Sequence, residues 1–256
     1  MYQLRRKLFS QNFFHNRKLI IKLLGRSSIG KNDLVLEIGP GKGIVTEQLL
    51  KQAQHVLAVE IDRYWYNYLQ KGFNSTNNLT LYLEDFLNFR LPVLPYKVFA
   101  NIPFSIEGKI IRKLIDAQNP PEDCYLVMMK EVAYRLAAPY KDNMFSVLHK
   151  PWFELSIYYQ FRRTDFIPVP SVDVVMLRFT KRTDSLLPWT EKAKYQQFIK
   201  TGFGQGQPVL QNLKKSYGRK RVVTELIKLN LNKEVKPGFV SIEQWVRLYR
   251  IFKNNG

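Results

Sequence analysis

Short apolar runs alternate with amphipathic stretches through the first half of the chain. Runs of about five apolar residues are typical of strands buried in a parallel sheet, whereas apolar residues three or four apart are typical of helices. The pattern predicts strands at 34–38, 56–60, 79–83, 96–101 and 125–129, with helices at 45–50, 64–71 and 107–117. Strands that alternate with helices predict an α/β fold, with a mainly parallel sheet covered by helices on both faces.

The pattern changes in the second half. The stretches 153–161 and 172–179 are β-rich with no helix between them, so we expect them to pair antiparallel at one edge of what becomes a seven-stranded sheet. After Lys181 the stretches 189–203, 208–217, 219–229 and 241–252 are all compatible with helices. We therefore predict an α/β domain over residues 1–181 and a small all-α domain over residues 182–256.

Composition excludes several classes of protein. Hydrophobic residues make up 45% of the 256 residues, enough for a sizeable core, yet no apolar run reaches membrane-spanning length. The single cysteine, Cys124, excludes an internal disulfide and a cysteine-based zinc site, and three scattered histidines do not suggest a metal. Residues 1–26 lack the uninterrupted apolar core of a secretory signal. We expect a soluble, cytoplasmic monomer without a metal or a membrane partner.

The net charge of +19 is unevenly distributed. Residues 1–26 contain seven basic residues and no acid, and residues 182–256 contain fifteen basic residues against five acids. Residues 27–181, with eighteen basic residues and sixteen acids, are nearly neutral. A basic surplus at both ends of a neutral core favours a polyanionic partner, and nucleic acid is the partner that we expect.

A glycine-rich turn and two carboxylates follow the first three predicted strands. Ligands of open α/β sheets bind beyond the carboxyl ends of the strands, where glycines such as Gly39 and Gly41 let the backbone approach closely. Glu60 can accept hydrogen bonds from both hydroxyls of a ribose, and Asp85 can accept one from an adenine amino group. Each feature alone has an ordinary structural explanation, as a packing turn, a solvated carboxylate or a cap. Together they predict a nucleoside site.

The fourth predicted strand ends in the run Asn101-Ile102-Pro103-Phe104. The Asn101 side-chain oxygen and the Ile102 carbonyl can accept the two hydrogens of an exocyclic amine, and Phe104 can stack on a base. Such bonds leave the nitrogen lone pair free to point at a methyl donor, so catalysis depends on positioning and no strong general base is needed. The alternative for this run is a plain Asn-x-Pro turn.

Five motifs resemble, in chain order, those of the ribosomal RNA adenine N6-dimethyltransferases: Gln11 to Phe14, Glu37 to Gly43, Glu60 to Asp62, Glu84 to Phe86 and Asn101 to Phe104. The resemblance implies a Rossmann-like class I methyltransferase fold with S-adenosyl-L-methionine as methyl donor. It also implies a set of cofactor-binding residues, which are Asn12, Phe14, Gly39, Gly41, Glu60, Ile61, Asp85 and Asn101.

The resemblance further implies which residues meet the target adenine. Asn101 matches the catalytic asparagine, beside Ile102 and Phe104. The run Asp165 to Val172 resembles a later motif whose phenylalanine closes over the base, so Phe104 and Phe166 would sandwich a flipped adenine. Without the resemblance, Phe166 would be interpreted as core filler beside an edge strand.

Two branches of the family compete. One dimethylates adjacent adenines of small-subunit ribosomal RNA during ribosome assembly. The other, the erythromycin-resistance (Erm) type, modifies one adenine of large-subunit (23S) RNA before full assembly, and so confers resistance to macrolides, lincosamides and streptogramin B. Ile102 and Phe104, the Gly-Lys-Gly turn and the C-terminal run Ser241 to Tyr249 resemble the second branch more closely.

If ribosomal RNA is the partner, the basic residues can bind its phosphates. The candidates for phosphate contacts are Arg5, Arg6, Lys7, Lys214, Lys215, Arg219, Lys220 and Arg221. Two other classes of protein stay open. A non-catalytic RNA-binding relative is disfavoured by the intact motifs, and an NAD-linked oxidoreductase is disfavoured because the third glycine, Gly43, comes one residue too early for a dinucleotide fingerprint.

Overall fold

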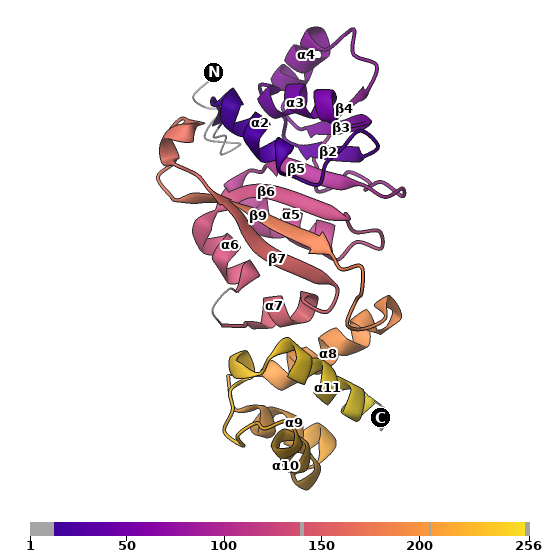
Figure 1. Ribbon diagram of the computed structural model, residues 1–256, viewed down its shortest axis with the longest axis vertical. Helices are drawn as coiled ribbons and strands as arrows, with labels where there is room; N and C mark the ends of the chain where they lie inside the picture. The colour runs from indigo at the N-terminus through magenta and orange to yellow at the C-terminus, as the bar shows by residue number, and fades with distance from the viewer. Residues whose placement is uncertain (1–12, 139–140, 205, 254–256) are drawn as a thin grey trace. The chain divides into compact units, whose positions relative to one another are not determined.

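The computed structural model describes residues 13–138, 141–204 and 206–253. Its main sheet has seven strands (Figure 1). The strands lie in the order β4-β3-β2-β5-β6-β9-β7. Neighbours from β4 to β6 are parallel, and β9 is antiparallel to β6. Their bounds are β2 Leu34–Ile38, β3 His55–Glu60, β4 Leu79–Leu83, β5 Lys97–Asn101, β6 Asp123–Met129, β7 Phe153–Gln160 and β9 Val174–Lys181. The predicted α/β fold, with a mainly parallel seven-stranded sheet, is confirmed.

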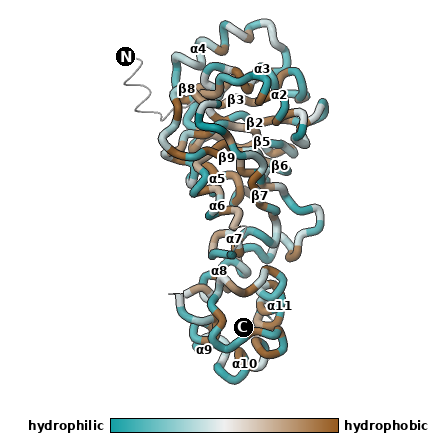
Figure 2. Tube along the Cα trace, turned by 60° about the vertical axis from the view of Figure 1, so that its left-hand side comes forward, coloured by the Kyte–Doolittle hydropathy of each residue, from teal (hydrophilic) through white to brown (hydrophobic). Residues whose placement is uncertain are grey.

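The central strands are buried on both faces, and Figure 2 shows that they contain many hydrophobic residues. Side chains alternate between the faces of a strand. In β5, Phe99 packs in a core cluster with residues of helices α2 (Arg17–Gly25) and α3 (Ile44–Gln52), while Val98 and Ala100, on the other face, are equally buried. A sheet buried in this way requires helices on both sides.

The helices that accompany the sheet begin and end at local signals. The Asn16 side chain accepts a hydrogen bond from the Leu19 N–H at the start of α2, and Asp62 does the same for Tyr64 at the start of α4. The bounds are α2 Arg17–Gly25, α3 Ile44–Gln52, α4 Arg63–Gly72, α5 Glu107–Ile115 and α6 Lys130–Ala137. A two-stranded ribbon pairs β1 (Phe13–Phe14) antiparallel with β8 (Phe166–Ile167).

Contacts within the chain divide it into two compact units, residues 1–133 with 156–181 and residues 134–155 with 182–256. The second unit therefore contains a segment, 134–155, that the sequence pattern assigns to the first domain. The core of the second unit is aromatic, with Tyr195, Trp245 and Tyr249 almost fully buried. Its helices are α7 Met144–His149, α8 Lys192–Phe203, α9 Val209–Tyr217, α10 Arg219–Lys228 and α11 Ile242–Lys253.

Candidate functional site

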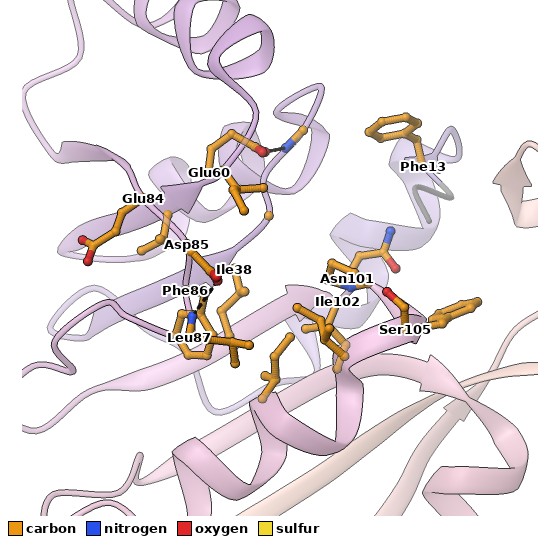
Figure 3. Close-up of a pocket in the computed structure, with 18 residues that line it drawn as sticks. Phe13, Ile38, Glu60, Glu84, Asp85, Phe86, Leu87, Asn101, Ile102 and Ser105 are labelled. Atoms are coloured by element: carbon orange, nitrogen blue, oxygen red, sulfur yellow. Dashed lines mark hydrogen bonds between the residues drawn. The ribbon is translucent and has the colours of Figure 1, made fainter. Parts of the chain in front are cut away.

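A cavity of about 280 Å³ opens at the carboxyl ends of β2 to β5 (Figure 3). The sheet order places β2 between β3 and β5, which is where the direction of strand succession reverses. Loops at such a point diverge and leave a crevice for a ligand. The predicted residues that line this cavity come from all four strand ends, and they are Gly39, Gly41, Glu60, Ile61, Asp85, Asn101, Ile102 and Phe104.

The turn after β2 requires glycine for its backbone conformation. Gly39, Gly41 and Gly43 have φ angles of 66°, 53° and 77°, in the left-handed region that other residues rarely adopt. A Cβ on Gly41 would lie 2.6 Å from Cε1 of Phe13. Since nothing lies within 4 Å of a Cβ built on Gly39, that glycine borders open space. The turn therefore exposes backbone to the cavity.

Glu60, at the end of β3, stabilises this turn through hydrogen bonds. Its Oε2 accepts a hydrogen bond from the Gly41 N–H at 3.0 Å, and its Oε1 accepts one from the Asp62 N–H at 2.8 Å. Burial raises the pKa of Glu60, while the two backbone bonds act in the opposite direction. A carboxylate oxygen has more than one acceptor position, so Glu60 can hold the turn and still accept from a hydroxyl in the cavity.

Asp85 lines the same cavity and also has a local role. Its Oδ1 accepts a hydrogen bond from the Leu87 N–H at 2.8 Å, which caps the turn after β4. Figure 3 shows Asp85 and Glu60 on the same side of the cavity, with Asn101 opposite them. The cavity therefore has carboxylates toward β3 and β4 and an amide at β5.

The segment from Asn101 to Phe104 passes from strand to helix at the cavity wall. Asn101 is the last residue of β5, and the Ile102 N–H donates to the Val127 carbonyl at 3.3 Å in the neighbouring strand. Pro103 then starts the short 3-10 helix Phe104–Ile106, which leads into α5. The strand thus fixes Asn101 while the turn presents Phe104, half-buried, to the same cavity.

Glu37 is a buried carboxyl that lies next to this site. It lines a second, smaller hollow together with Asn101 and Lys42, and it is only 2% exposed. Its Oε2 has no hydrogen-bond partner among the described residues. Burial is the main reason that the pKa of Glu37 is raised to about 8; hydrogen bonds from Thr46 act in the opposite direction, and the charge of Glu60 adds a smaller increase. A buried acceptor without a partner suits a ligand that brings a cationic group.

The two phenylalanines of β1 point in different directions. Phe13, which the sequence motifs did not single out, lines the main cavity, whereas Phe14 lines only the smaller hollow. Phe166 is fully buried and stacks on Phe14 at 4.8 Å between ring centroids, because the two residues are paired across the ribbon. It does not line the cavity, so the expected sandwich with Phe104 is not formed in this structure. A role of Phe166 against a bound adenine stays a prediction.

The remaining predicted residues lie elsewhere. Asn12, Arg5, Arg6 and Lys7 are outside the described residues. In the second unit, Lys214, Lys215, Arg219 and Lys220 are exposed on either side of Gly218, which joins α9 to α10. We call these four residues the basic turn. Arg221 is instead half-buried, donates to the Ile251 carbonyl at 3.1 Å and lies over the Phe252 ring.

The site fits S-adenosylmethionine in its donor and acceptor groups. The carboxylates of Glu60 and Asp85 line the cavity, and the hollow beside it contains the Glu37 oxygen that has no hydrogen-bond partner among the described residues. Within the described chain, no three His, Cys, Asp or Glu side chains are grouped so that they could hold a metal ion. None of the described helices is long and apolar enough to span a membrane.

Comparison with known proteins gives consistent matches over nearly the whole chain. The model of the family described as "Ribosomal RNA adenine dimethylase" matches residues 2–254. A "Ribosomal RNA small subunit methyltransferase A" from Nostoc sp. (strain PCC 7120) is 32% identical, with 95% of this chain and 96% of that protein covered. A protein of the same name from Lactococcus lactis is 31% identical, with 95% and 88% covered.

Solved structures agree with this result. The crystal structure of 23S rRNA methyltransferase ErmE aligns with a TM-score of 0.85 at 27% identity, covering 94% of this chain and all of that one. A dimethyladenosine transferase from Plasmodium falciparum aligns with a TM-score of 0.79 at 22% identity, covering 94% and 98%. The second likeness supports the fold alone.

Proposed function

This chain belongs to the ribosomal RNA adenine dimethylase family, and from that premise we propose that it methylates N6 of one adenine in large-subunit ribosomal RNA. The family establishes the coarser part: the chain is an S-adenosylmethionine-dependent methyltransferase of ribosomal RNA adenines. The target RNA and the residue roles are our proposal. The observation that carries it is the position of Asn101 in one cavity with the glycine turn, Glu60 and Asp85.

The proposed residue roles follow from that position. Gly39 and Gly41 present backbone to the donor, Glu60 accepts from its ribose, and Asp85 accepts from its adenine amino group. S-adenosylmethionine supplies an electrophilic methyl group on a sulfonium. Glu37, buried beside Asn101, is the candidate acceptor for the cationic end of the donor.

The target adenine enters from the β5 side. The Asn101 side-chain oxygen and the Ile102 carbonyl accept the two N6 hydrogens, which fixes the direction of the nitrogen lone pair. Phe104 stacks on the base and helps to exclude water. The nitrogen loses its proton after it attacks the methyl group, so the site requires alignment rather than a strong base.

The large-subunit target is supported by two observations. Ile102 and Phe104 are the residues typical of the erythromycin-resistance branch, and 23S rRNA methyltransferase ErmE shares the fold over its full length at 27% identity. A large-subunit target would make the chain a determinant of resistance to macrolides, lincosamides and streptogramin B. The second candidate is a small-subunit target, because the curated relatives described above are all named small-subunit methyltransferases.

The test is methyl transfer from labelled S-adenosylmethionine to protein-free 23S and 16S ribosomal RNA, with the modified base mapped. We expect label on one adenine of the 23S RNA. Label on adjacent adenines of the 16S RNA would replace the large-subunit proposal by the second candidate. Absence of label in both RNAs would remove both.

A further inference from the structure

The outer face of helix α4 carries aromatic side chains that the methyl-transfer site does not use. Tyr64 and Tyr68 are each 53% exposed, whereas Trp65, between them, is 7% exposed. The Trp65 ring is in edge contact with both, at 5.0 Å from the Tyr64 ring and 5.7 Å from the Tyr68 ring. Since Trp65 is anchored in the fold, it holds the two exposed rings in place.

Ring contacts link the exposed tyrosines to the cavity. Phe13 lines the cavity, and its ring lies 5.4 Å from Trp65 in an edge contact. Ile61, which also lines the cavity, is half exposed and lies three residues before Tyr64. Tyr64 and Tyr68 are four residues apart in α4 and so share one face of that helix, which forms a line of exposed rings, and Ile61 lies just before the N-cap Asp62, at the cavity end of this line.

The charge around this line suits a polyanion. Arg63 and Lys71 are exposed on the same helix, and no acid occurs from Arg63 to Leu83. The Nζ of Lys42 lies 5.0 Å above the Phe13 ring at the cavity end. Surfaces that bind single-stranded nucleic acid combine cations along the backbone path with aromatic rings on which the bases stack. An apolar protein partner would instead favour a patch with fewer charges.

We propose that the single-stranded RNA next to the target adenine stacks its bases on Tyr64 and Tyr68, while Arg63 and Lys71 face its phosphates. The proposal rests on the proposed function, because it takes the substrate to be RNA whose target base lies in the adjacent cavity. It adds a substrate-binding surface on α4, in the first unit, to the basic turn of the second unit. The rings select unpaired nucleotides, since the bases of a duplex are stacked on one another.

The test measures binding of an adenosine-containing single-stranded RNA of about ten nucleotides, by fluorescence anisotropy, to the wild type, Tyr64→Ala/Tyr68→Ala and Tyr64→Phe/Tyr68→Phe. We expect the alanine variant to bind at least about tenfold more weakly and the phenylalanine variant to bind within about twofold of the wild type. The dependence of affinity on salt should stay the same in both, because no cation is removed. An RNA of equal length with abasic positions should bind the wild type about as weakly as the intact RNA binds the alanine variant.

Several outcomes would overturn the proposal. These are equal binding by the alanine variant and the wild type, equal losses in the alanine and phenylalanine variants, and tight binding of the abasic RNA. Defective methylation of assembled ribosomal particles, with normal methylation of free RNA, would assign the rings to a protein partner instead. Calorimetry with S-adenosylmethionine checks that each variant is folded.

A second measurement needs no variant. Photocrosslinking of the wild type to RNA that carries 4-thiouridine should label the peptide that contains Tyr64 and Tyr68, and label confined to other peptides would contradict the proposal. The methylation assay on the wild type reports separately on the proposed function. A protein that binds RNA through these rings but methylates neither ribosomal RNA would refute the function and leave the stacking surface intact.

Discussion

Asn101 is the residue on which the proposed chemistry depends, and its variant gives the first prediction. Asn101→Ala removes the side-chain oxygen that would orient the amine, so we expect methyl transfer to fall by about 10²- to 10³-fold or more. Affinity for RNA should change little, because phosphate contacts dominate it. Rates with labelled donor and a separate RNA-binding titration measure the two effects. Asn88→Ala, at an exposed asparagine outside the cavity, is the control, and full activity of the Asn101 variant would refute the role.

Glu37 gives a prediction about pH. Its carboxyl has a pKa of about 8 in the folded protein and an ordinary value in the unfolded chain, so the folded state binds the extra proton between these values. Stability therefore declines as pH rises from about 4.5 to about 8, by up to roughly 1.4 kcal/mol per pH unit. Glu37→Gln should remove this decline, so its stability relative to the wild type should be greater at pH 8.5 than at pH 5.

Urea unfolding at the two pH values measures this difference. Glu122→Gln, which changes an exposed carboxylate, is the control and should follow the wild type. If the free energies of unfolding of the Glu37 variant and the wild type differ by the same amount at both pH values, the buried carboxyl does not take up a proton on folding.

At the level of single residues, the motifs predicted the cavity better than they predicted the aromatic contacts. Glu60, Asp85 and Asn101 were expected together because the carboxyl ends of neighbouring parallel strands meet at one edge of a sheet. Phe13 and Phe14 are adjacent and chemically identical, so only the pairing of β1 with β8 decides which of them faces the cavity. That pairing joins segments about 150 residues apart, which no local pattern reveals.

At the level of elements, one buried ionic group stabilises the end of the sheet that is opposite to the cavity. Asp123, at the start of β6, accepts hydrogen bonds from Arg178 at 2.6 Å, from Ser28 at 2.7 Å and from Tyr125 at 2.9 Å. Burial alone would raise the pKa of Asp123, but the bonds from Arg178 and Ser28 outweigh it and the pKa is lowered. The group ties β6, β9 and the segment after α2 together.

Arg178→Met should therefore destabilise the fold strongly, because it leaves the Asp123 carboxylate buried without its main partner. We expect the free energy of unfolding to fall by about 3–5 kcal/mol. Arg163→Met is the matched control, since Arg163 and Asp173 form an ion pair that is about half exposed on both sides, and such pairs contribute about 1 kcal/mol or less. Denaturant unfolding compares the two variants, and similar decreases in both would contradict the argument.

Among the elements, the strands of the main sheet and most of the longer helices followed their patterns, whereas α2, with nine residues, was not predicted and neither were the short elements. The parallel strands and the helices α8 to α11 lie where the apolar spacing placed them. The helices α6 and α7, with eight and six residues, contain too few turns to show a period, and β1 and β8, with two residues each, have no pattern. The division into residues 1–181 and 182–256 stays a prediction. Contacts between residues that are far apart in the sequence group the segment 134–155 with the second unit, and no local pattern reveals such contacts.

For the molecule as a whole, the effect of the net charge of +19 on RNA binding depends on where the basic residues lie. Helix α10 begins with Arg219, Lys220 and Arg221, at the end of a helix where the backbone dipole already places positive charge. Such an arrangement is unfavourable for the isolated protein and becomes favourable when phosphates approach. Arg221 differs from its neighbours because it contacts Ile251 and Phe252 within the second unit. The two kinds of residue should respond differently to substitution.

Changing the four residues of the basic turn to glutamine should weaken RNA binding without affecting the donor. Each cation that neutralises a phosphate releases counterions, so the slope of log affinity against log salt should become shallower by about 0.7 to 0.9 for every phosphate that is no longer neutralised. Affinity for S-adenosylmethionine should not change, because the cavity lies wholly in the first unit. Arg221→Gln should instead lower the melting temperature and leave the salt slope nearly unchanged. If the four-residue variant keeps the wild-type slope, the RNA is held elsewhere on the chain, and the aromatic face of α4 with Arg63 and Lys71 becomes the first surface to test.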